Sequence, residues 1–132
     1  MEKTYIMLKP DAYKRSLVGE IISRIEKKGL KIKEMKMFNL KSETIDEHYK
    51  HLADKPFFGE LKSFMMSGPV VGMIIEGEKA VSAMRRLMGP TNWEEALPGT
   101  IRGDYAFNMT ENLIHGSDSV ENAKEEIERF FN

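Results

Sequence analysis

The stretch Thr4–Gly29, "TYIMLKPDAYKRSLVGEIISRIEKKG", decides the fold because it joins an apolar run to an amphipathic segment. Thr4–Lys9 is almost continuously apolar and ends at Pro10, which is typical of a strand buried on both faces. Apolar residues then recur at helical spacing between Ser16, the expected N-cap, and Gly29, the expected stop. These residues are Leu17, Val18, Ile21, Ile22 and Ile25. The segment predicts a central strand followed by a helix packed on the sheet.

A second strand and helix follow the same order further along the chain. Leu30–Leu40 alternates apolar and charged residues and shifts phase near Glu34 and Met35, which predicts a half-exposed strand with a bulge. Pro69–Gly77 predicts another buried strand, and Glu78–Met88 predicts a helix with an apolar face. The chain therefore contains two β-α-β units.

The remaining segments complete the predicted architecture. Short helices are expected at Ser42–Lys50 and Phe57–Met66, a long loop at Gly89–Arg102, a fourth strand at Asp104–Met109, and a closing helix after Asp118. This order fits the α+β class: a ferredoxin-like split β-α-β fold with a four-stranded antiparallel sheet and helices on one face. A helical insertion and a C-terminal helix are added to it.

Composition limits the class of protein. The chain has 132 residues, of which 41% are hydrophobic, so we expect one domain over residues 1–132. It has no cysteine, no secretory signal and no apolar run near the ~20 residues that span a bilayer, which predicts a cytoplasmic protein without membrane contact. A net charge of −1 excludes the strongly basic field of a dedicated DNA-binding domain. A local cluster must therefore hold any anionic ligand.

His115 is the first candidate for chemistry. It lies before Gly116 and Ser117, at the junction of an apolar segment and a helix, where open backbone N–H groups suit an anion. An isolated histidine here can equally be a core residue whose hydrogen bonds are satisfied. In the chemical interpretation, a neutral imidazole is a nucleophile, and a carboxylate on its other nitrogen would fix the tautomer.

Glu126 is the candidate for that carboxylate. It falls on the apolar stripe of the closing helix with Ala123 and Phe130, and a carboxylate on a buried face needs a partner. From there it can reach toward His115 or Ser117. The alternative is a carboxylate at the edge of the stripe that extends into solvent. Asp118 is the expected N-cap of this helix.

Three cations are candidates for a phosphate clamp. Lys9 lies at the carboxyl end of a buried strand, Arg85 lies beside the apolar stripe of its helix, and Arg102 follows a Leu-Pro-Gly-Thr turn. Each alone would usually be a surface residue, whereas three beside apolar segments and a histidine favour oxyanion binding. Arg86 points to another face, and we expect it to be solvated.

Other phosphate and metal motifs are missing from the sequence. There is no Gly-rich loop followed by Lys-Ser or Lys-Thr, no Gly-x-Gly-x-x-Gly and no His-Arg-Asp, which excludes a P-loop enzyme and a protein kinase. His48 and His51 are three residues apart and can share a helix face. Because no third ligand accompanies them, we expect solvated histidines rather than a metal site.

Five motifs in order resemble the nucleoside diphosphate kinase family over essentially the whole chain. They are LKPDAYKRSLVGEII from Leu8, HYKHLADKPFF from His48, MRRLMGPTN from Met84, PGTIRGDY from Pro98 and NLIHGSDSVENAKEEI from Asn112. The resemblance implies ping-pong transfer of a γ-phosphate from a nucleoside triphosphate to a diphosphate through a phosphohistidine. It also implies Mg²⁺ as cofactor, held mainly by the nucleotide phosphates, with no direct protein ligand.

The resemblance also assigns roles to residues. His115 becomes the nucleophile that forms a pros-phosphohistidine, and Phe57 stacks on the base, which suits broad specificity because every base has a π-face. The implied catalytic residues are His115, Lys9, Tyr49, Ser117 and Glu126. The implied nucleotide-binding residues are Lys9, Phe57, Arg85, Thr91, Arg102 and Asn112.

The implied partners are nucleoside tri- and diphosphates, including ATP, GTP and GDP in ribo and deoxy forms, with no nucleic acid as primary partner. The resemblance further implies a homo-oligomer, a hexamer or a tetramer. Trp93, where the family usually has proline, and the chain end at Asn132 do not distinguish these two states. The alternative function is a nucleotide- or nucleic-acid-binding regulator with vestigial phosphotransfer. Against it, none of the implied site positions is missing.

Overall fold

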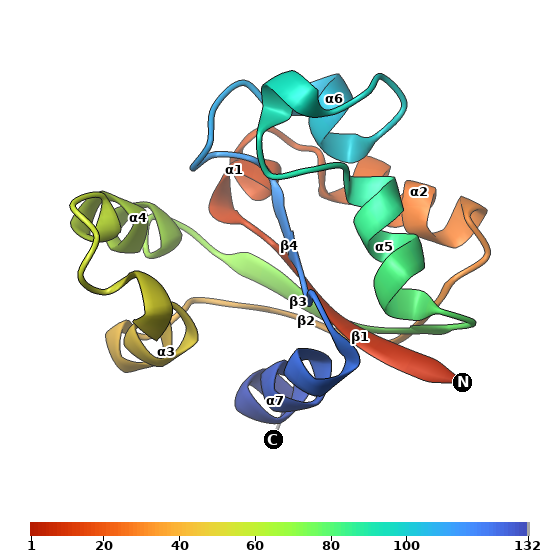
Figure 1. The fold of residues 1–132 in the computed structure, drawn as a ribbon, viewed down its shortest axis with the longest axis horizontal. Helices are drawn as coiled ribbons and strands as arrows, with labels where there is room; N and C mark the ends of the chain where they lie inside the picture. The colour runs from red at the N-terminus through yellow and green to blue at the C-terminus, as the bar shows by residue number, and fades with distance from the viewer. Residues whose placement is uncertain (132) are drawn as a thin grey trace.

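A computed structural model describes residues 1–131, which form a four-stranded antiparallel sheet in the order β2-β3-β1-β4 (Figure 1). The strands are β1 (Glu2–Leu8), β2 (Lys31–Phe38), β3 (Val70–Gly77) and β4 (Ile114–Gly116). The inner strands β1 and β3 are buried along most of their length, as their apolar runs predict. This strand order is that of the split β-α-β fold and confirms the predicted class.

The first face of the sheet carries the two crossover helices, α2 (Val18–Lys27) and α5 (Ala80–Met88). Two short helices, α1 (Pro10–Lys14) and α6 (Ile101–Tyr105), border them (Figure 1). The core on this face contains Ile6, Leu8, Ile21, Ile25, Met73, Ile75 and Met84. Burying the apolar stripes of α2 and α5 here stabilises both helices, since each is too short to be stable alone in water.

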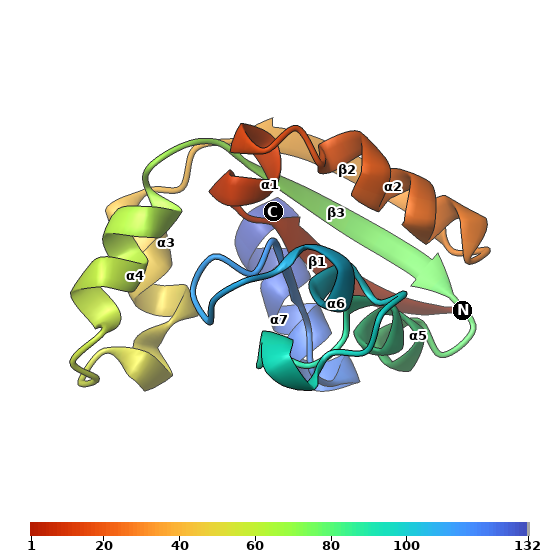
Figure 2. The same ribbon diagram turned by 90° about the horizontal axis from the view of Figure 1, so that it is seen from above.

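The second face carries the insertion and the terminal helix. These helices are α3 (Ser42–His48), α4 (Phe58–Met65) and α7 (Val120–Phe131). Tyr5 and Met7 of β1 pack against them, together with Ile45, Met65 and Phe130. Figure 2 shows α3 and α4 together at the end of the sheet remote from the N-terminus. Helices therefore cover both faces of the sheet.

The fourth strand lies later in the chain than predicted. Asp104–Met109 is not a strand, because Ile101–Tyr105 forms α6, whose N-cap Thr100 accepts a hydrogen bond from the Gly103 N–H at 2.9 Å. Asp104 and Tyr105, the first two residues of the predicted strand, are part of this helix. The true strand β4 is only three residues long, and in it His115 pairs with Met7 of β1.

Several local predictions hold and two capping predictions are wrong. Gly29 ends the helix region with a φ of +97°, and the register of β2 shifts between Ile32 and Glu34, as the phase change predicts. Ser16 has a φ of +60° and caps nothing, since α2 starts at Val18 with Leu17 before it.

The cap of α7 is Ser119 rather than Asp118, because the Ser119 hydroxyl accepts from the Asn122 N–H at 3.1 Å. The predicted loop at Gly89–Arg102 contains a 3-10 turn, η2 (Trp93–Glu95), and a second turn, η1 (Lys50–Leu52), follows α3. No helix within residues 1–131 is both long and apolar enough to cross a membrane.

Candidate functional site

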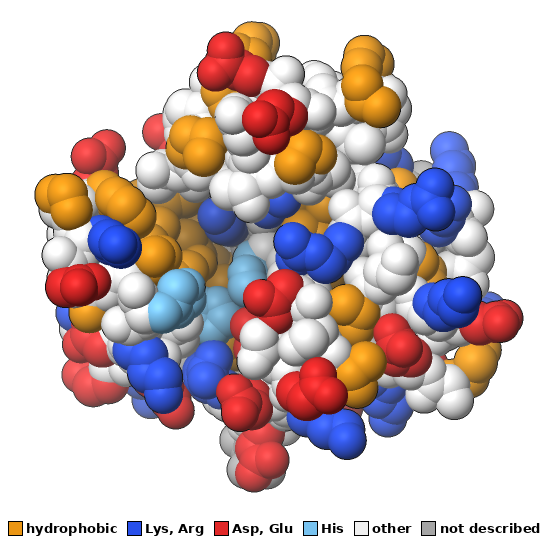
Figure 3. Space-filling view, in the orientation of Figure 1, with side chains coloured by type: hydrophobic (Ala, Val, Ile, Leu, Met, Phe, Trp, Pro, Cys, Tyr) orange, Lys and Arg blue, Asp and Glu red, His pale blue; other side chains and the backbone are white. Residues whose placement is uncertain are grey.

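Two adjoining hollows form a cleft between the insertion and the segments around α6. One is a polar pocket of about 300 Å³ that reaches the start of α7, and the other is a more apolar pocket of about 560 Å³ that reaches α4. Both are lined by Tyr49, Thr91, Arg102 and His115. Figure 3 shows histidine side chains at the edge of this hollow, with Lys and Arg side chains on its border and hydrophobic side chains inside. The cleft thus suits a ligand with a charged end and an apolar end.

His115 stands in β4 with one ring nitrogen engaged. Its Nε2 lies 3.0 Å from the Glu126 Oε1, and the Ser117 hydroxyl donates to the same oxygen at 2.6 Å. An ionised carboxylate only accepts hydrogen bonds, so Nε2 carries the proton and Nδ1 keeps its lone pair. This contact answers the question left by the sequence, since Glu126 reaches both candidate partners and does not extend into solvent.

Opposing effects set the pKa of Glu126. Burial raises it, but the hydrogen bonds from His115 and Ser117 together with the positive potential of His115 leave it below its ordinary value. Glu126 is therefore ionised at neutral pH, and its charge is available to stabilise an imidazolium at His115.

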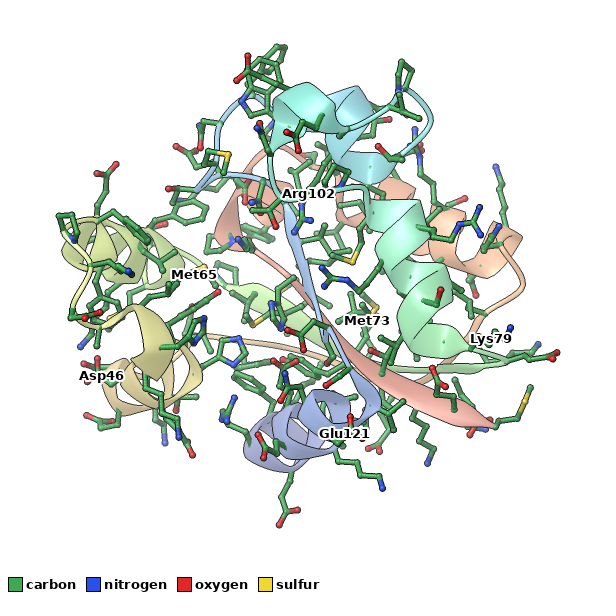
Figure 4. The ribbon with its side chains drawn as sticks, viewed as in Figure 1. Asp46, Met65, Met73, Lys79, Arg102 and Glu121 are labelled. Carbon is green, nitrogen blue, oxygen red and sulfur yellow. The ribbon has the colours of Figure 1, made fainter. Side chains whose placement is uncertain are left out.

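Arg102 is fixed by the backbone around it. Its guanidinium, carried by α6, donates to the carbonyls of Gly89 at 2.9 Å, Asn112 at 3.4 Å and Ile114 (Figure 4). Three of its five N–H groups are used in this way, which leaves two for a ligand. Burial and the neighbouring Arg85 lower the pKa of Arg102 to about 10, so the side chain stays charged at neutral pH.

Lys9 and Asn112 form a second fixed pair. The Lys9 ammonium is buried and donates to the Asn112 Oδ1 at 2.8 Å, while the Asn112 amide donates to the Met109 carbonyl at 2.8 Å. Burial and the nearby Arg102 lower the pKa of Lys9 to about 8. A buried ammonium whose one acceptor among residues 1–131 is a neutral amide oxygen is a strong candidate to pair with an anion.

Tyr49 and Arg85 complete the polar half of the cleft. The Tyr49 hydroxyl is buried and has no hydrogen-bond partner among residues 1–131, and burial followed by the Glu126 charge raises its pKa. It therefore remains a donor at neutral pH. Arg85 reaches the same half from α5 and donates to the Gly116 carbonyl at 3.3 Å. Both side chains line the polar pocket together with His115.

The apolar half of the cleft contains Phe57, whose side chain is 47% exposed at the start of α4. Leu52, Leu61 and Met109 line the same pocket. A flat aromatic ring exposed at an apolar wall is a suitable surface for stacking. Sequence patterns did not identify Leu52, Leu61 and Met109 as lining residues, because apolar spacing marks them only as core candidates.

His48 is where the sequence interpretation was wrong. It is buried, with 7% exposure, and its ring lies 4.8 Å from that of His115, whereas His51 is exposed, as expected. Burial lowers the pKa of His48 to about 3. The position was readable in part, since His48 follows the buried Ile45 by three residues on α3 and so falls on the buried face.

Comparison with known proteins gives one family. A family model described as nucleoside diphosphate kinase matches residues 2–132. The chain is 55% identical over 131 residues to the nucleoside diphosphate kinase of Exiguobacterium sibiricum. The alignment covers 99% of this chain and 95% of that protein.

Two solved structures are similar over nearly the whole chain. The apo nucleoside diphosphate kinase of Encephalitozoon cuniculi gives a TM-score of 0.96 at 50% identity and covers 98% of this chain and 88% of that one. The halophilic nucleoside diphosphate kinase of Halobacterium salinarum in complex with CDP gives a TM-score of 0.95 at 47% identity and covers 99% of this chain and 88% of that one.

Proposed function

The chain belongs to the nucleoside diphosphate kinase family, and we propose that it transfers the γ-phosphate of a nucleoside triphosphate to a nucleoside diphosphate through a phosphohistidine at His115. One observation carries this proposal for the residue: the Glu126 Oε1 lies 3.0 Å from the His115 Nε2, which leaves the lone pair on Nδ1. Because His115 lines both halves of the cleft, this nitrogen belongs to a ring that a bound triphosphate can reach.

The first half-reaction forms a bond between the His115 Nδ1 and the γ-phosphorus. The bond from that phosphorus to the β-γ bridging oxygen breaks, and the nucleoside diphosphate leaves with its electron pair. The ring then carries a positive charge, which the Glu126 carboxylate stabilises with support from the Ser117 hydroxyl. In the second half-reaction a terminal phosphate oxygen of another diphosphate attacks the same phosphorus, and Nδ1 regains its lone pair.

The cations position the phosphates rather than react with them. Arg102 offers two free N–H groups from a guanidinium that three carbonyls hold in place, so little ordering is needed when ligand binds. Lys9 supplies a buried point charge, and Arg85 supplies a third cation from α5. Alignment and charge neutralisation of this kind supply most of the catalysis in phosphoryl transfer.

Tyr49, Thr91 and Asn112 are proposed as further ligand contacts. The Tyr49 hydroxyl is a buried donor without a partner among residues 1–131, so a phosphate oxygen would satisfy it. Thr91 lines both halves of the cleft, and Asn112 already holds Lys9. Phe57 is proposed to stack on the base, which reads no hydrogen-bond pattern and so accepts many bases.

Mg²⁺ is the proposed cofactor, and the residues of the cleft fit a metal that arrives on the phosphates. The cleft has two carboxylates, Asp118 and Glu126, and each already accepts hydrogen bonds, from Asn122 and from His115 with Ser117. Among residues 1–131 the lining therefore leaves one oxygen of Asp118 and one of Glu126 without a hydrogen bond, which is too few ligands to hold the ion, so the nucleotide phosphates would hold most of it. When bound, Mg²⁺ would neutralise phosphate charge and favour transfer.

A homo-oligomer, a hexamer or a tetramer, is part of the same proposal. Apolar side chains exposed beyond the cleft support it, among them Leu97 at 72%, Phe107 at 76% and Met37 of the edge strand β2 at 55%. Equilibrium ultracentrifugation of the purified protein tests it. A mass of four or six protomers is expected, and a monomer at micromolar concentration would contradict it.

The phosphohistidine is tested by incubating the protein with Mg²⁺ and γ-labelled ATP without acceptor. We expect an acid-labile, base-stable label that moves to added GDP and is absent from His115→Ala, a variant that should keep the wild-type circular dichroism spectrum. A His115→Ala variant that still transfers phosphate would overturn the assignment. Absence of label despite ATP binding, with salt-sensitive binding of single-stranded DNA, would instead support the regulator.

A further inference from the structure

The proposed mechanism uses one imidazole, but two lie together at the site. His48, at the end of α3, packs against His115 with ring centroids 4.8 Å apart and an interplanar angle of 80°. Tyr49 and Phe130 also pack against the His48 ring, at 4.6 and 5.2 Å. Two neighbouring imidazoles have similar intrinsic reactivity, so something must determine which of them receives the phosphate.

Helix α7 contacts both rings with side chains of opposite charge. Glu126 accepts from the His115 Nε2, and Arg129, three residues further along the same helix, places its Nη1 2.8 Å from the His48 Nδ1. A guanidinium can only donate, so the His48 Nδ1 must accept. A neutral His48 then carries its proton on Nε2. The two rings therefore share the Nε2–H tautomer but differ at Nδ1: the lone pair is free in His115, whereas in His48 it accepts from Arg129.

We propose that Arg129 is a positioning residue that holds His48 as the neutral Nε2–H tautomer and thereby leaves His115 as the one imidazole of the pair able to accept a phosphate. This inference rests on the proposed function, because the choice between two imidazoles matters only if the site transfers a phosphate. The tautomers themselves depend only on the hydrogen bonds of Glu126 and Arg129.

The charges around His48 agree with this arrangement. Besides burial, three groups that are positive when protonated lower its pKa, namely His115 on β4, Arg129 on α7 and His51 on η1, while Glu126 on α7 raises it. A neutral His48 matters because His115 becomes positively charged when it is phosphorylated. A second cation 4.8 Å away would oppose that charge.

The same hydrogen bond limits metal binding. His48, His115 and Glu126 offer ligand atoms that all lie within 4.8 Å of one another, and two imidazoles with a carboxylate are a set that Zn²⁺ accepts. With Arg129 on one nitrogen of His48 and a proton on the other, that ring has no lone pair to give. Loss of Arg129 should therefore make the histidine pair sensitive to Zn²⁺.

Glu47 provides a matched control. Its Oε1 lies 3.6 Å from the Arg129 Nε, and its side chain is 61% exposed, so this ion pair contributes little and does not contact either imidazole. Glu47→Gln removes an Arg129 contact but keeps the hydrogen bond to His48. Arg129→Met removes that hydrogen bond while retaining most of the apolar stem, and Arg129→Lys restores a donor without the planar guanidinium.

The direct test is NMR of ring nitrogens in protein labelled with ¹⁵N-histidine. In wild type and Glu47→Gln we expect a His48 ring protonated on Nε2 alone that does not titrate between pH 5 and 8. In Arg129→Met we expect mixed tautomers or a titration in that range, with partial recovery in Arg129→Lys. A wild-type His48 protonated on Nδ1, or an unchanged ring in Arg129→Met, would overturn the proposal.

Turnover gives a second readout that general loss of structure would not produce. For Arg129→Met we expect the acid limb of the pH profile of kcat to move to higher pH than for Glu47→Gln. We also expect Zn²⁺ to inhibit Arg129→Met at concentrations at least about tenfold lower than Glu47→Gln. Equal pH profiles and equal inhibition in the two variants would count against the proposal. If Arg129→Met does not fold, the His48 tautomer measured in wild type and in Arg129→Lys decides whether the proposal holds. Absence of a phosphohistidine in wild type would remove the proposed function, whereas the tautomer measurement would stand.

Discussion

At the scale of single residues, Tyr5 and Gly72 fit each other across the two central strands. The Tyr5 hydroxyl is buried without a hydrogen-bond partner within residues 1–131, and a Cβ on Gly72 would lie 2.7 Å from it. The same Cβ would lie 3.0 Å from Phe38. The hydroxyl is therefore accommodated because position 72 has no side chain, and it contributes no hydrogen bond in return.

Gly72→Ala should destabilise the protein by about 1–3 kcal/mol through overpacking. Tyr5→Phe should be neutral or stabilising, because it removes a buried donor that has no partner. Combining Tyr5→Phe with Gly72→Ala should recover part of the loss, with Phe38 accounting for the rest. Urea unfolding of the two single variants and the double variant measures this coupling. Additive effects would contradict the contact.

The lowered pKa of Lys9 leads us to expect that nucleotide binding depends on pH. This pKa in the free protein is about 8, so the ammonium that should meet a phosphate is lost as the pH rises through that value. If bound phosphate keeps Lys9 charged, affinity for ADP should fall about tenfold between pH 7 and 9, since each pKa unit corresponds to 1.36 kcal/mol. Calorimetric titration at several pH values tests this. Lys9→Met should bind more weakly and lack this dependence, and an unchanged wild-type affinity would contradict it.

The residues of the site divide into those that sequence reasoning reaches and those it does not. Glu126 was readable because a carboxylate on an apolar stripe needs a partner, and its contacts with His115 and Ser117 follow that logic. The burial of His48 beside His115 was not predicted, because it depends on α3 packing against α7, and the spacing of residues within α3 indicates only which face is buried. The contact of Arg129 with His48 depends on the same packing, and no sequence pattern identified it.

At the scale of elements, α6 shows how a local cap can override strand propensity. The segment Asp104–Met109 contains Tyr and Phe in alternation, yet Thr100 starts a helix at Ile101 by accepting from the Gly103 N–H and donating to the Leu97 carbonyl at 2.7 Å. The strand β4 was missed because it is three residues long and depends on pairing with β1 at the other end of the chain. Longer elements, such as α2 and β3, were predicted within a few residues.

Gly103 should be essential for α6 and so for the position of Arg102. A Cβ there would overlap the Leu97 carbonyl and lie 2.7 Å from the Thr100 hydroxyl, so the turn would have to open. Gly103→Ala should lower the free energy of unfolding by about 2 kcal/mol or more and weaken ADP binding at least about tenfold. Urea unfolding and calorimetry measure these effects.

Gly19 on α2 is the matched control, since a Cβ there meets nothing within 4 Å. Gly19→Ala should stabilise the protein by about 0.5–1 kcal/mol and leave ADP binding unchanged. Equal stability of the two alanine variants would contradict the role assigned to Gly103.

At the scale of the whole molecule, the cleft draws on parts that are far apart in sequence. Lys9 follows β1, Tyr49 and Phe57 belong to the insertion, Arg102 lies on α6 and His115 on β4. The order of the apolar runs was enough to predict the fold class, because the class depends on the full pattern of strands and helices. The cleft itself depends on how these segments pack together, which no local pattern contains.

A ligand in this cleft should therefore tie the insertion to the rest of the domain. With ADP at 100 times its Kd, we expect the free energy of unfolding to rise by about 2.7 kcal/mol. Hydrogen exchange should slow most in α3, α4 and α6, which border the cleft, whereas in α2, which does not line it, exchange should slow by no more than the global stabilisation. Uniform slowing across all helices would indicate that the ligand acts by global stabilisation alone.

The short strand β4 also has a consequence for folding. His115 is held in register by β1, and the Ser117 hydroxyl lies 3.4 Å from the Tyr5 amide nitrogen, 112 residues away in sequence. Contacts between such distant residues carry the largest loop-closure cost and form slowly. A refolding chain should therefore regain helical signal before it regains phosphotransfer, so that recovered activity reports the completion of the native topology.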